Sequence, residues 1–324
     1  MIAMKNKNKI AAWSSYWSEG NITSFPNLFA ENYGGDISCF WSETFSVLRE
    51  HNRVLDICTG NGAIAILARD YINRRNIGCD IHAIDVAKIQ SHKLQDSDAT
   101  FNNIKFHSGA AVEKTRFPDN YFDLIVGQFA LEYCNIEDGI KELSRIIRKD
   151  GAIVLMMHHA NSITVKNTHD IIDIGKVFLK EPNIFFRLRK YAEQYSRQKI
   201  KDAPKVIQKR NQLMVSFNEV NKLFRQFPNN NFLQVTLDNI KYIAERIHNN
   251  SSVQISEIRE FEKTVKYHLI RMQDQRDAAS DIEKMSELEE LFHRYKFISV
   301  KFKPYYMDGV LFAWTLKAEK NNYK

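Results

Sequence analysis

The amino-acid sequence predicts an α/β protein with a mostly parallel sheet of seven strands and a large helical insertion between the fifth and sixth strands. From Arg53 to Met157, short β-branched runs alternate with helical patterns, which is typical of a parallel sheet flanked by helices. Residues 163–278 contain almost no strand signal. Strand character returns in Phe297–Pro304 and Gly309–Leu316, which are close enough in sequence to pair as an antiparallel hairpin.

Five strands are expected before the insertion. They are Arg53–Ile57, Asp80–Asp85, Ile104–His107, Phe122–Gly127 and Ala152–Met157. A helix from about Gly62 to Tyr71 follows the first strand. Another helix begins after Asn135, a typical N-cap residue, and is expected to end just before Gly151 as its C′ residue.

The chain divides into four predicted parts. Residues 1–52 form an N-terminal segment rich in aromatic residues, residues 53–160 the core, residues 161–280 the helical insertion, and residues 281–324 the final helix and hairpin. The N-terminal segment either closes over a binding site as a lid or packs as a helix on the outer face of the sheet. An insertion at this place usually shapes a ligand pocket or an oligomer contact.

The composition is that of a soluble globular chain, with 44% hydrophobic and 26% charged residues. Its longest apolar stretch is far shorter than the roughly 20 residues that a membrane span needs. The N-terminus lacks the apolar centre of a signal peptide. Four cysteines without metal-ligand spacing indicate reduced thiols. We therefore expect a cytoplasmic protein with no membrane span and no bound metal.

The net charge of +7 is concentrated in the second half of the chain. Lys180–Arg225 alone carries 12 basic and 4 acidic side chains. Such a surface could attract an anionic partner, such as RNA, a phosphate group or a carrier protein. A solvated helix face is the simpler interpretation.

The residues best suited to bind a ligand lie around the end of the first strand, in the sequence VLDICTGNGA that begins at Val54. Asp56 stands near the strand's end, and Gly60 and Gly62 allow a ligand to approach the backbone closely. The N–H groups that open the next helix favour a carboxylate or a phosphate. Asp85 ends the second strand, where a carboxylate can accept hydrogen bonds from both hydroxyls of a ribose. Together these residues predict a site for a nucleoside-containing cofactor.

Two cofactor classes compete for this loop, because GNGAIA also satisfies the dinucleotide pattern G-x-G-x-x-A. Three features disfavour an NAD-linked oxidoreductase. Asp56 precedes the glycines, where its charge would repel a pyrophosphate. The stretch FPDNYFDLIV from Phe117 to Val126 resembles a sequence pattern typical of methyltransferases. The two C-terminal strands fit the antiparallel edge of a methyltransferase sheet.

Residues from about Arg53 to Met157, with Glu287–Glu319, resemble the class I S-adenosylmethionine-dependent methyltransferase superfamily, most closely its small-molecule branch that includes ubiquinone and menaquinone biosynthesis. The resemblance implies a Rossmann-like sheet and S-adenosylmethionine as cofactor. It also implies which residues hold each part of the cofactor: Asp56, Thr59, Gly60 and Gly62 the methionine end, Asp85 the ribose, Ala110 and Ala111 the adenine, and Gln128 and Phe129 the sulfonium.

Two positions depart from the family pattern. Cys58 stands where members usually have glycine, and Ala110 stands where many carry an acid that accepts the adenine amino group.

Methyl transfer from a sulfonium is an in-line displacement, so a protein must align the reactants, exclude water and deprotonate an O–H or N–H acceptor. The residues after the fourth and fifth strands are therefore the catalytic candidates. His158 and His159 are the first proton acceptors to consider, followed by Glu132 and Tyr133.

We expect methyl transfer to an O, N or C atom of a small metabolite, a lipid-like molecule or a natural product. An RNA or protein methyltransferase that uses the basic helices is an alternative, as is a non-catalytic S-adenosylmethionine-binding protein. The sequence leaves the oligomeric state open.

Overall fold

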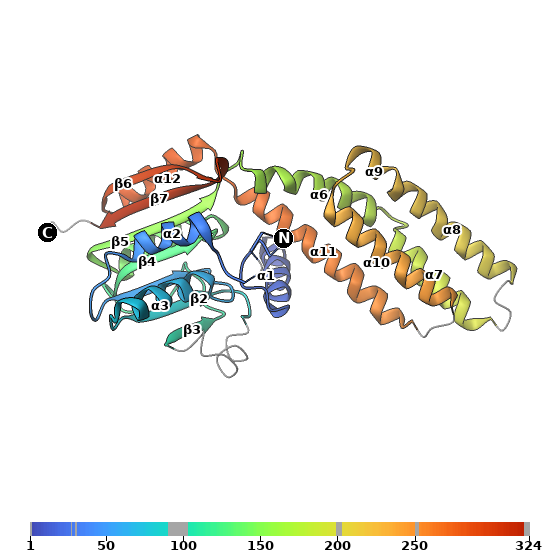
Figure 1. Ribbon diagram of the computed structural model, residues 1–324, viewed down its shortest axis with the longest axis horizontal. Helices are drawn as coiled ribbons and strands as arrows, with labels where there is room; N and C mark the ends of the chain where they lie inside the picture. The colour runs from blue at the N-terminus through green and yellow to red at the C-terminus, as the bar shows by residue number, and fades with distance from the viewer. Residues whose placement is uncertain are drawn as a thin grey trace. The chain divides into compact units, whose positions relative to one another are not determined.

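The computed structural model describes residues 2–26, 28–29, 31–89, 103–198, 203–249 and 253–320. Two compact units divide the chain. The first consists of Met1–Val165 and Asp274–Lys324, and the second of Lys166–Gln273. Each unit has its own hydrophobic core, and Figure 1 shows the course of the chain through both.

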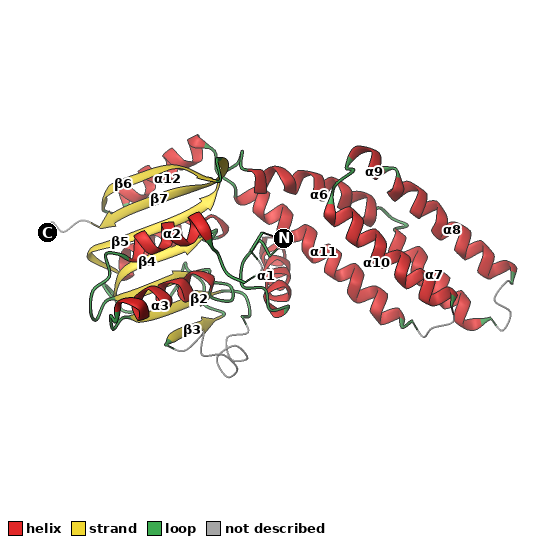
Figure 2. Cartoon of the chain, in the orientation of Figure 1, coloured by secondary structure: helices red, strands yellow, loops and turns green. Residues whose placement is uncertain are grey.

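A seven-stranded sheet forms the centre of the first unit, with the strand order β3-β2-β1-β4-β5-β7-β6 (Figure 2). The first five strands run parallel, and β7 pairs antiparallel with both β5 and β6. This arrangement confirms the predicted sheet and its C-terminal hairpin. The strands are β1 (Arg53–Ile57), β2 (Asp80–Asp85), β3 (Ile104–Ser108), β4 (Phe122–Gln128), β5 (Ile147–His158), β6 (Phe297–Met307) and β7 (Val310–Lys320).

Helices cover both faces of this sheet, because the strands alternate apolar side chains between two separate cores. On one face, Trp41 and Phe45 pack with residues of the helix that follows β1. On the other face, Ile140 and Phe292 come from two helices far apart in sequence. The elements of this unit are α1 (Ile2–Ser18), α2 (Gly35–Phe45), α3 (Ala63–Arg75), the short 3-10 helix η2 (Leu131–Tyr133), α5 (Ile136–Ile146) and α12 (Ile282–Arg294).

Helix α5 begins as predicted but ends earlier than the sequence indicates. The side chain of Asn135 accepts a hydrogen bond from the backbone N–H of Asp138, as an N-cap does. The helix stops at Ile146, and the chain passes directly into β5, where Ile147 pairs with Phe122. Gly151 therefore lies inside a strand, and its prediction as a C′ residue was wrong. Pairing with β4 decides this boundary, and the local helix signal does not contain that information.

Helices are the regular secondary structure of the second unit in its described residues, with short turns between them. Its helices share one apolar core that includes Phe178, Leu188 and Leu237. Two of them, α6 and α11, also carry the chain into and out of this unit. The helices are α6 (Ile163–Leu179), α7 (Ile184–Arg197), α8 (Pro204–Asn221), α9 (Leu223–Gln226), α10 (Asn231–His248) and α11 (Ile255–Ala278).

The basic stretch Lys180–Arg225 runs along α7, α8 and α9, except that residues 199–202 lie outside the described residues. Some of its cations already have acidic partners, because Arg189 pairs with Glu262 and Lys190 with Glu193. An anionic partner for this stretch stays a prediction.

In the part of the chain that the structure describes, no helix combines the length and apolar character that a membrane crossing requires.

Gly175 of α6 tests the packing of the second unit. A Cβ at this position would lie 2.2 Å from Cδ2 of Leu269 on α11. We expect Gly175→Ala to lower the free energy of unfolding by about 1–3 kcal/mol through overpacking, although alanine is intrinsically the better helix former. Urea denaturation followed by far-UV circular dichroism measures the change.

The double variant Gly175→Ala/Leu269→Ala is the matched control. Truncating Leu269 makes room for the new methyl group, so the double variant should be more stable than the sum of the single effects indicates. Additive effects would contradict the proposed contact.

Candidate functional site

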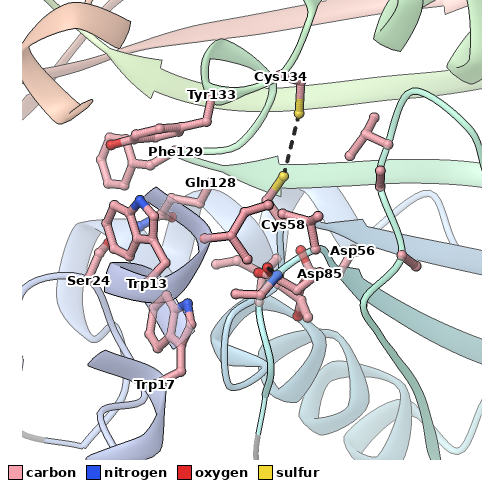
Figure 3. A pocket seen from close by; sticks show the side chains of 18 of the residues that line it. Trp13, Trp17, Ser24, Asp56, Cys58, Asp85, Gln128, Phe129, Tyr133 and Cys134 are labelled. Atoms are coloured by element: carbon pink, nitrogen blue, oxygen red, sulfur yellow. Dashed lines mark hydrogen bonds between the residues drawn. The ribbon is translucent and has the colours of Figure 1, made fainter. Parts of the chain in front are cut away.

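A cavity of about 530 Å³ opens at the carboxyl ends of β1, β2 and β4 (Figure 3). Ligands of open α/β sheets bind at this edge, and the volume lies within the range of small-molecule sites. Its walls come from the loops after these strands, from α1 and the segment that follows it, and from the end of α11. The lining includes Lys9, Trp13, Trp17, Ser24, Tyr33, Asp56, Cys58, Thr59, Asp85, Ala110, Ala111, Val112, Gln128, Phe129, Tyr133, Cys134 and Asp274.

Asp56, near the end of β1, is a buried carboxyl with one unsatisfied oxygen. Its Oδ2 accepts hydrogen bonds from the Thr59 hydroxyl (2.5 Å) and from the Ala65 N–H (3.1 Å). Its Oδ1 is buried and has no hydrogen-bond partner among the described residues. Burial, with a smaller contribution from the charge of Asp85, raises the pKa of Asp56 to about 7. Asp56 therefore offers the cavity an acceptor that would gain from a cationic donor.

Asp85, at the end of β2, holds two loops together. Its Oδ2 accepts from the Gly60 N–H (2.8 Å), and its Oδ1 accepts from the Ala87 N–H (2.7 Å). Burial raises its pKa to about 6, although both hydrogen bonds favour the ionised form. The two acids that the sequence analysis singled out thus line one cavity.

The two glycines of the loop do not line the cavity, but their lack of a side chain is needed for packing. Both have positive φ, +54° at Gly60 and +94° at Gly62. A Cβ at Gly60 would lie 2.5 Å from the Trp17 ring, and a Cβ at Gly62 would lie 2.7 Å from the Phe106 ring. Aromatic rings of this chain therefore occupy the space beside the loop that the sequence analysis expected a ligand to approach.

The remaining predicted cofactor residues, Thr59, Ala110, Ala111, Gln128 and Phe129, all line the cavity. The amide of Gln128 is only half satisfied. Its Oε1 accepts from the indole N–H of Trp41 (2.6 Å), while its buried Nε2 has no partner in the part of the chain that the structure describes. An unpaired buried donor is costly, so this nitrogen also favours a ligand.

Among the four candidate proton acceptors, Tyr133 lines the cavity and the two histidines do not. The Tyr133 hydroxyl lies 2.8 Å from Nε2 of His158. His158 is buried behind Phe129, with the two rings stacked at 4.1 Å, and burial lowers its pKa to about 3. His159 stacks on Trp314 instead, with a centroid distance of 4.3 Å.

Glu132 organises the backbone of this wall. Its carboxylate accepts hydrogen bonds from the N–H groups of Ala130 (3.0 Å) and His158 (2.8 Å). Burial raises the pKa of Glu132 to about 7. The structure thus places Glu132 behind the cavity wall, where it joins the end of β4 to the end of β5.

Two aromatic residues of the N-terminal segment, Trp13 and Trp17, form a wall of the cavity, and the sequence analysis named neither of them as a site residue. Trp13 and Trp17 of α1 stack with their centroids 5.9 Å apart, and Trp13 meets Tyr133 edge to face at 5.7 Å (Figure 3). Asn61 fastens the end of this helix, because its side-chain amide donates to the carbonyls of Trp17 and Asn21, each at 2.8 Å. Trp13 and Trp17 of α1 thus line the cavity, and a role of this segment as a lid stays a prediction.

Asp274 of α11 is a second residue that the sequence analysis missed. Its carboxylate accepts from the indole N–H of Trp13 (3.0 Å) and forms an ion pair with Lys9. No local sequence pattern indicates this role, because Asp274 lies more than 250 positions from α1 in the chain.

Within the described residues, no group of three or more His, Cys, Asp or Glu side chains is arranged to hold a metal ion.

Comparison with known proteins shows what the central part of this chain resembles. Residues 54–151 match the family model of the methyltransferase domain. The chain is 30% identical over 113 residues to the uncharacterized methyltransferase YcgJ of Bacillus subtilis, covering 35% of this chain and 43% of the relative. It is 30% identical over 141 residues to the ubiquinone/menaquinone biosynthesis C-methyltransferase UbiE of Stutzerimonas stutzeri, covering 40% and 52%. The chain thus spans about half the length of the curated relatives it matches.

Among solved structures, that of the Bacillus subtilis YcgJ protein aligns with 88% of this chain and 98% of its own, with 13% identity and a TM-score of 0.36.

The strand order and the cavity at the strand tips define a Rossmann-like class I methyltransferase domain. Residues 54–151, which carry the first four strands and the start of β5, are similar to the methyltransferase domain family. The predicted resemblance to the small-molecule branch of the superfamily is confirmed.

Proposed function

We propose that this protein transfers the methyl group of S-adenosylmethionine to a small-molecule acceptor. The observation that carries the proposal is one cavity lined by two buried carboxyls from neighbouring strand tips. Two polar atoms of its lining residues have no hydrogen-bond partner among the described residues. These atoms are Oδ1 of Asp56 and Nε2 of Gln128. The pair consists of one acceptor and one donor, which suits a ligand that carries both kinds of group.

S-adenosylmethionine fits this donor and acceptor set. Its ammonium group would donate a hydrogen bond to Oδ1 of Asp56. An acceptor atom near the methionine end would accept a hydrogen bond from Nε2 of Gln128. Asp85 keeps lone pairs for the two ribose hydroxyls, because each of its oxygens accepts one backbone N–H. Ala110 and Ala111 would border the adenine. When bound, the cofactor supplies an electrophilic methyl group on a sulfonium.

The residues of this chain would orient the acceptor and exclude water. Trp13, Phe129 and Tyr133 form aromatic walls, which favour a planar or apolar acceptor. The α1 helix is held at the cavity by Asn61 and by Asp274. Removing water strengthens every electrostatic interaction inside such a site.

We propose Tyr133 and His158 as the proton-handling pair. The Tyr133 hydroxyl would take the acceptor's proton while donating its own to Nε2 of His158. This requires the His158 tautomer with its proton on Nδ1. Because burial lowers the pKa of His158 to about 3, the pair is a weak base. It suits an acceptor that is already acidic, such as a phenol, a quinol or an activated carbon acid.

The methylated atom is proposed to be O, N or C, as the sequence analysis expects. The name of the UbiE relative, a C-methyltransferase, supports carbon.

Binding of S-adenosylhomocysteine tests the cofactor assignment. At 100 times its dissociation constant, the product should stabilise the protein by about 2.7 kcal/mol, whereas NAD should not. We expect Asp85→Ala to remove most of this shift. Asp80→Ala is the matched control, because Asp80 lies at the other end of the same strand, outside the cavity, and its side chain is about half exposed. Equal affinity for parent and Asp85→Ala would contradict the ribose assignment. Thermal unfolding with and without ligand measures this stabilisation in the parent and in both variants.

The pH dependence of binding follows from the two raised pKa values. The ionised forms of Asp56 and Asp85 accept hydrogen bonds best, so the bound state should hold fewer protons than the free protein. Affinity for S-adenosylhomocysteine should therefore fall as the pH decreases through about 7 to about 6, and binding near neutral pH should release protons.

Calorimetry in two buffers of different ionisation enthalpy measures this release. Asp56→Asn should reduce it, since an amide does not titrate. A proton balance of zero near neutral pH would argue against both carboxyls as cofactor ligands.

Tyr133→Phe tests the proton-handling pair. Methyl transfer from labelled S-adenosylmethionine to a panel of phenols, quinols, amines and carbon acids should fall by about a hundredfold or more. Affinity for S-adenosylhomocysteine should stay near that of the parent. Tyr305→Phe, outside the cavity, is the control. Full turnover in Tyr133→Phe would remove Tyr133 from the mechanism, and binding without transfer to any acceptor would favour a non-catalytic protein.

A further inference from the structure

Two cysteine thiols meet in the wall of the cofactor cavity. Sγ of Cys58 lies 3.8 Å from Sγ of Cys134 (Figure 3), and both residues line the cavity. Cys58 follows β1, and Cys134 follows η2, 76 positions later in the chain. Both thiols also point to the carbonyl oxygen of Ala130, at 3.7 and 3.8 Å. The fold therefore brings two reactive groups together at a site that the methyl-transfer mechanism does not use.

The backbone at Cys58 makes its side chain unexpected. Its φ is +48°, in the left-handed region that favours glycine. A cysteine here accepts a conformational cost that glycine would avoid.

We propose that Cys58 and Cys134 form a dithiol site that a peroxide oxidises reversibly to a disulfide, and that this bond closes the cavity to the cofactor. The closure of the cavity to the cofactor rests on the proposed function, whereas the formation of the disulfide does not.

The chemistry consumes one peroxide for each disulfide. A thiolate attacks one oxygen of hydrogen peroxide, the O–O bond breaks, and a sulfenic acid and hydroxide form. The second thiol attacks the sulfenic sulfur, the S–S bond forms, and the S–O bond breaks. Together the two thiol protons and the released oxygens give two molecules of water. A small dithiol such as dithiothreitol reverses the reaction by exchange.

The surroundings of Cys58 lower its reactivity. The hydrogen bond to Cys134, together with burial, raises the pKa of the Cys58 thiol. The thiolate is the nucleophile, so little of Cys58 is reactive at neutral pH. The oxidation should therefore be slow at neutral pH and faster at higher pH.

The geometry allows the bond after a small movement. A disulfide needs about 2.05 Å between sulfurs, roughly 1.8 Å less than the present separation. Neither cysteine is part of a helix or strand, since Cys134 is extended at the end of η2 and Cys58 lies in the loop after β1. The adjoining loops can therefore shift without breaking sheet pairing.

That movement would disturb the carboxyls proposed to bind the cofactor. Thr59 and Gly60 directly follow Cys58, and they donate the hydrogen bonds that Asp56 and Asp85 accept. Pulling Cys58 towards Cys134 displaces both donors. By linkage, a bound cofactor should protect the two thiols to the same extent that the disulfide weakens its binding.

The experiment uses the full-length chain with Cys39→Ser and Cys79→Ser, so that Cys58 and Cys134 are its only thiols. The protein is treated with hydrogen peroxide, with and without S-adenosylhomocysteine, and the disulfide is mapped by mass spectrometry of proteolytic peptides. Calorimetry then measures affinity for S-adenosylhomocysteine before oxidation, after it and after dithiothreitol. We expect a Cys58–Cys134 bond, affinity lowered by about tenfold or more and then restored, and slower oxidation in the presence of the ligand.

Cys134→Ser in the same background is the matched control, compared with its own reduced state. Peroxide should leave its affinity unchanged. The proposal is overturned if no intramolecular bond forms, if the bond forms without loss of affinity, or if the control loses affinity equally. If the reduced parent does not bind S-adenosylhomocysteine, the proposed function fails and cavity closure falls with it. In that case, the presence or absence of the mapped disulfide alone tests whether Cys58 and Cys134 form a dithiol site.

Discussion

The site depends on the burial of two carboxyls at neighbouring strand tips. Parallel pairing of β1 with β2 sets Ile57 opposite Ile84, so Asp56 and Asp85 reach the same edge of the sheet. Burial disfavours their charged forms and raises both pKa values. The hydroxyl of Thr59 and the N–H of Gly60 offset part of that cost and fix the loop between the acids. A ligand with complementary donors would offset the rest.

A second constraint is the wall built by the turn after β4. Glu132 holds this turn by accepting two backbone N–H groups, one from the turn and one from His158 at the end of β5. The adjacent Tyr133 and Cys134 then face the cavity with different chemistry. Proton handling and thiol oxidation would thus use consecutive residues of one turn in the cavity wall.

Local patterns in the sequence predicted much of this structure. Strand bounds such as Arg53–Ile57 and the N-cap at Asn135 follow from residues close together in the chain, and the structure has them. The predicted end of helix α5 next to Gly151 was wrong, because pairing between Ile147 and Phe122 begins strand β5 before that point. The glycines of the loop were noticed, but their partners, the rings of Trp17 and Phe106, were not. Those rings belong to distant segments.

The sequence by itself determined the class of fold and singled out the glycine loop and the two acids, because hydrophobic periodicity and glycine placement are local properties. Only the tertiary structure decided which side chains share the cavity. It brought Trp13 and Asp274 there from opposite ends of the chain, set Tyr133 in front of His158, and placed Cys58 beside Cys134. Such contacts depend on long-range packing, and no spacing of residues along the chain encodes a distance between elements that meet only after folding.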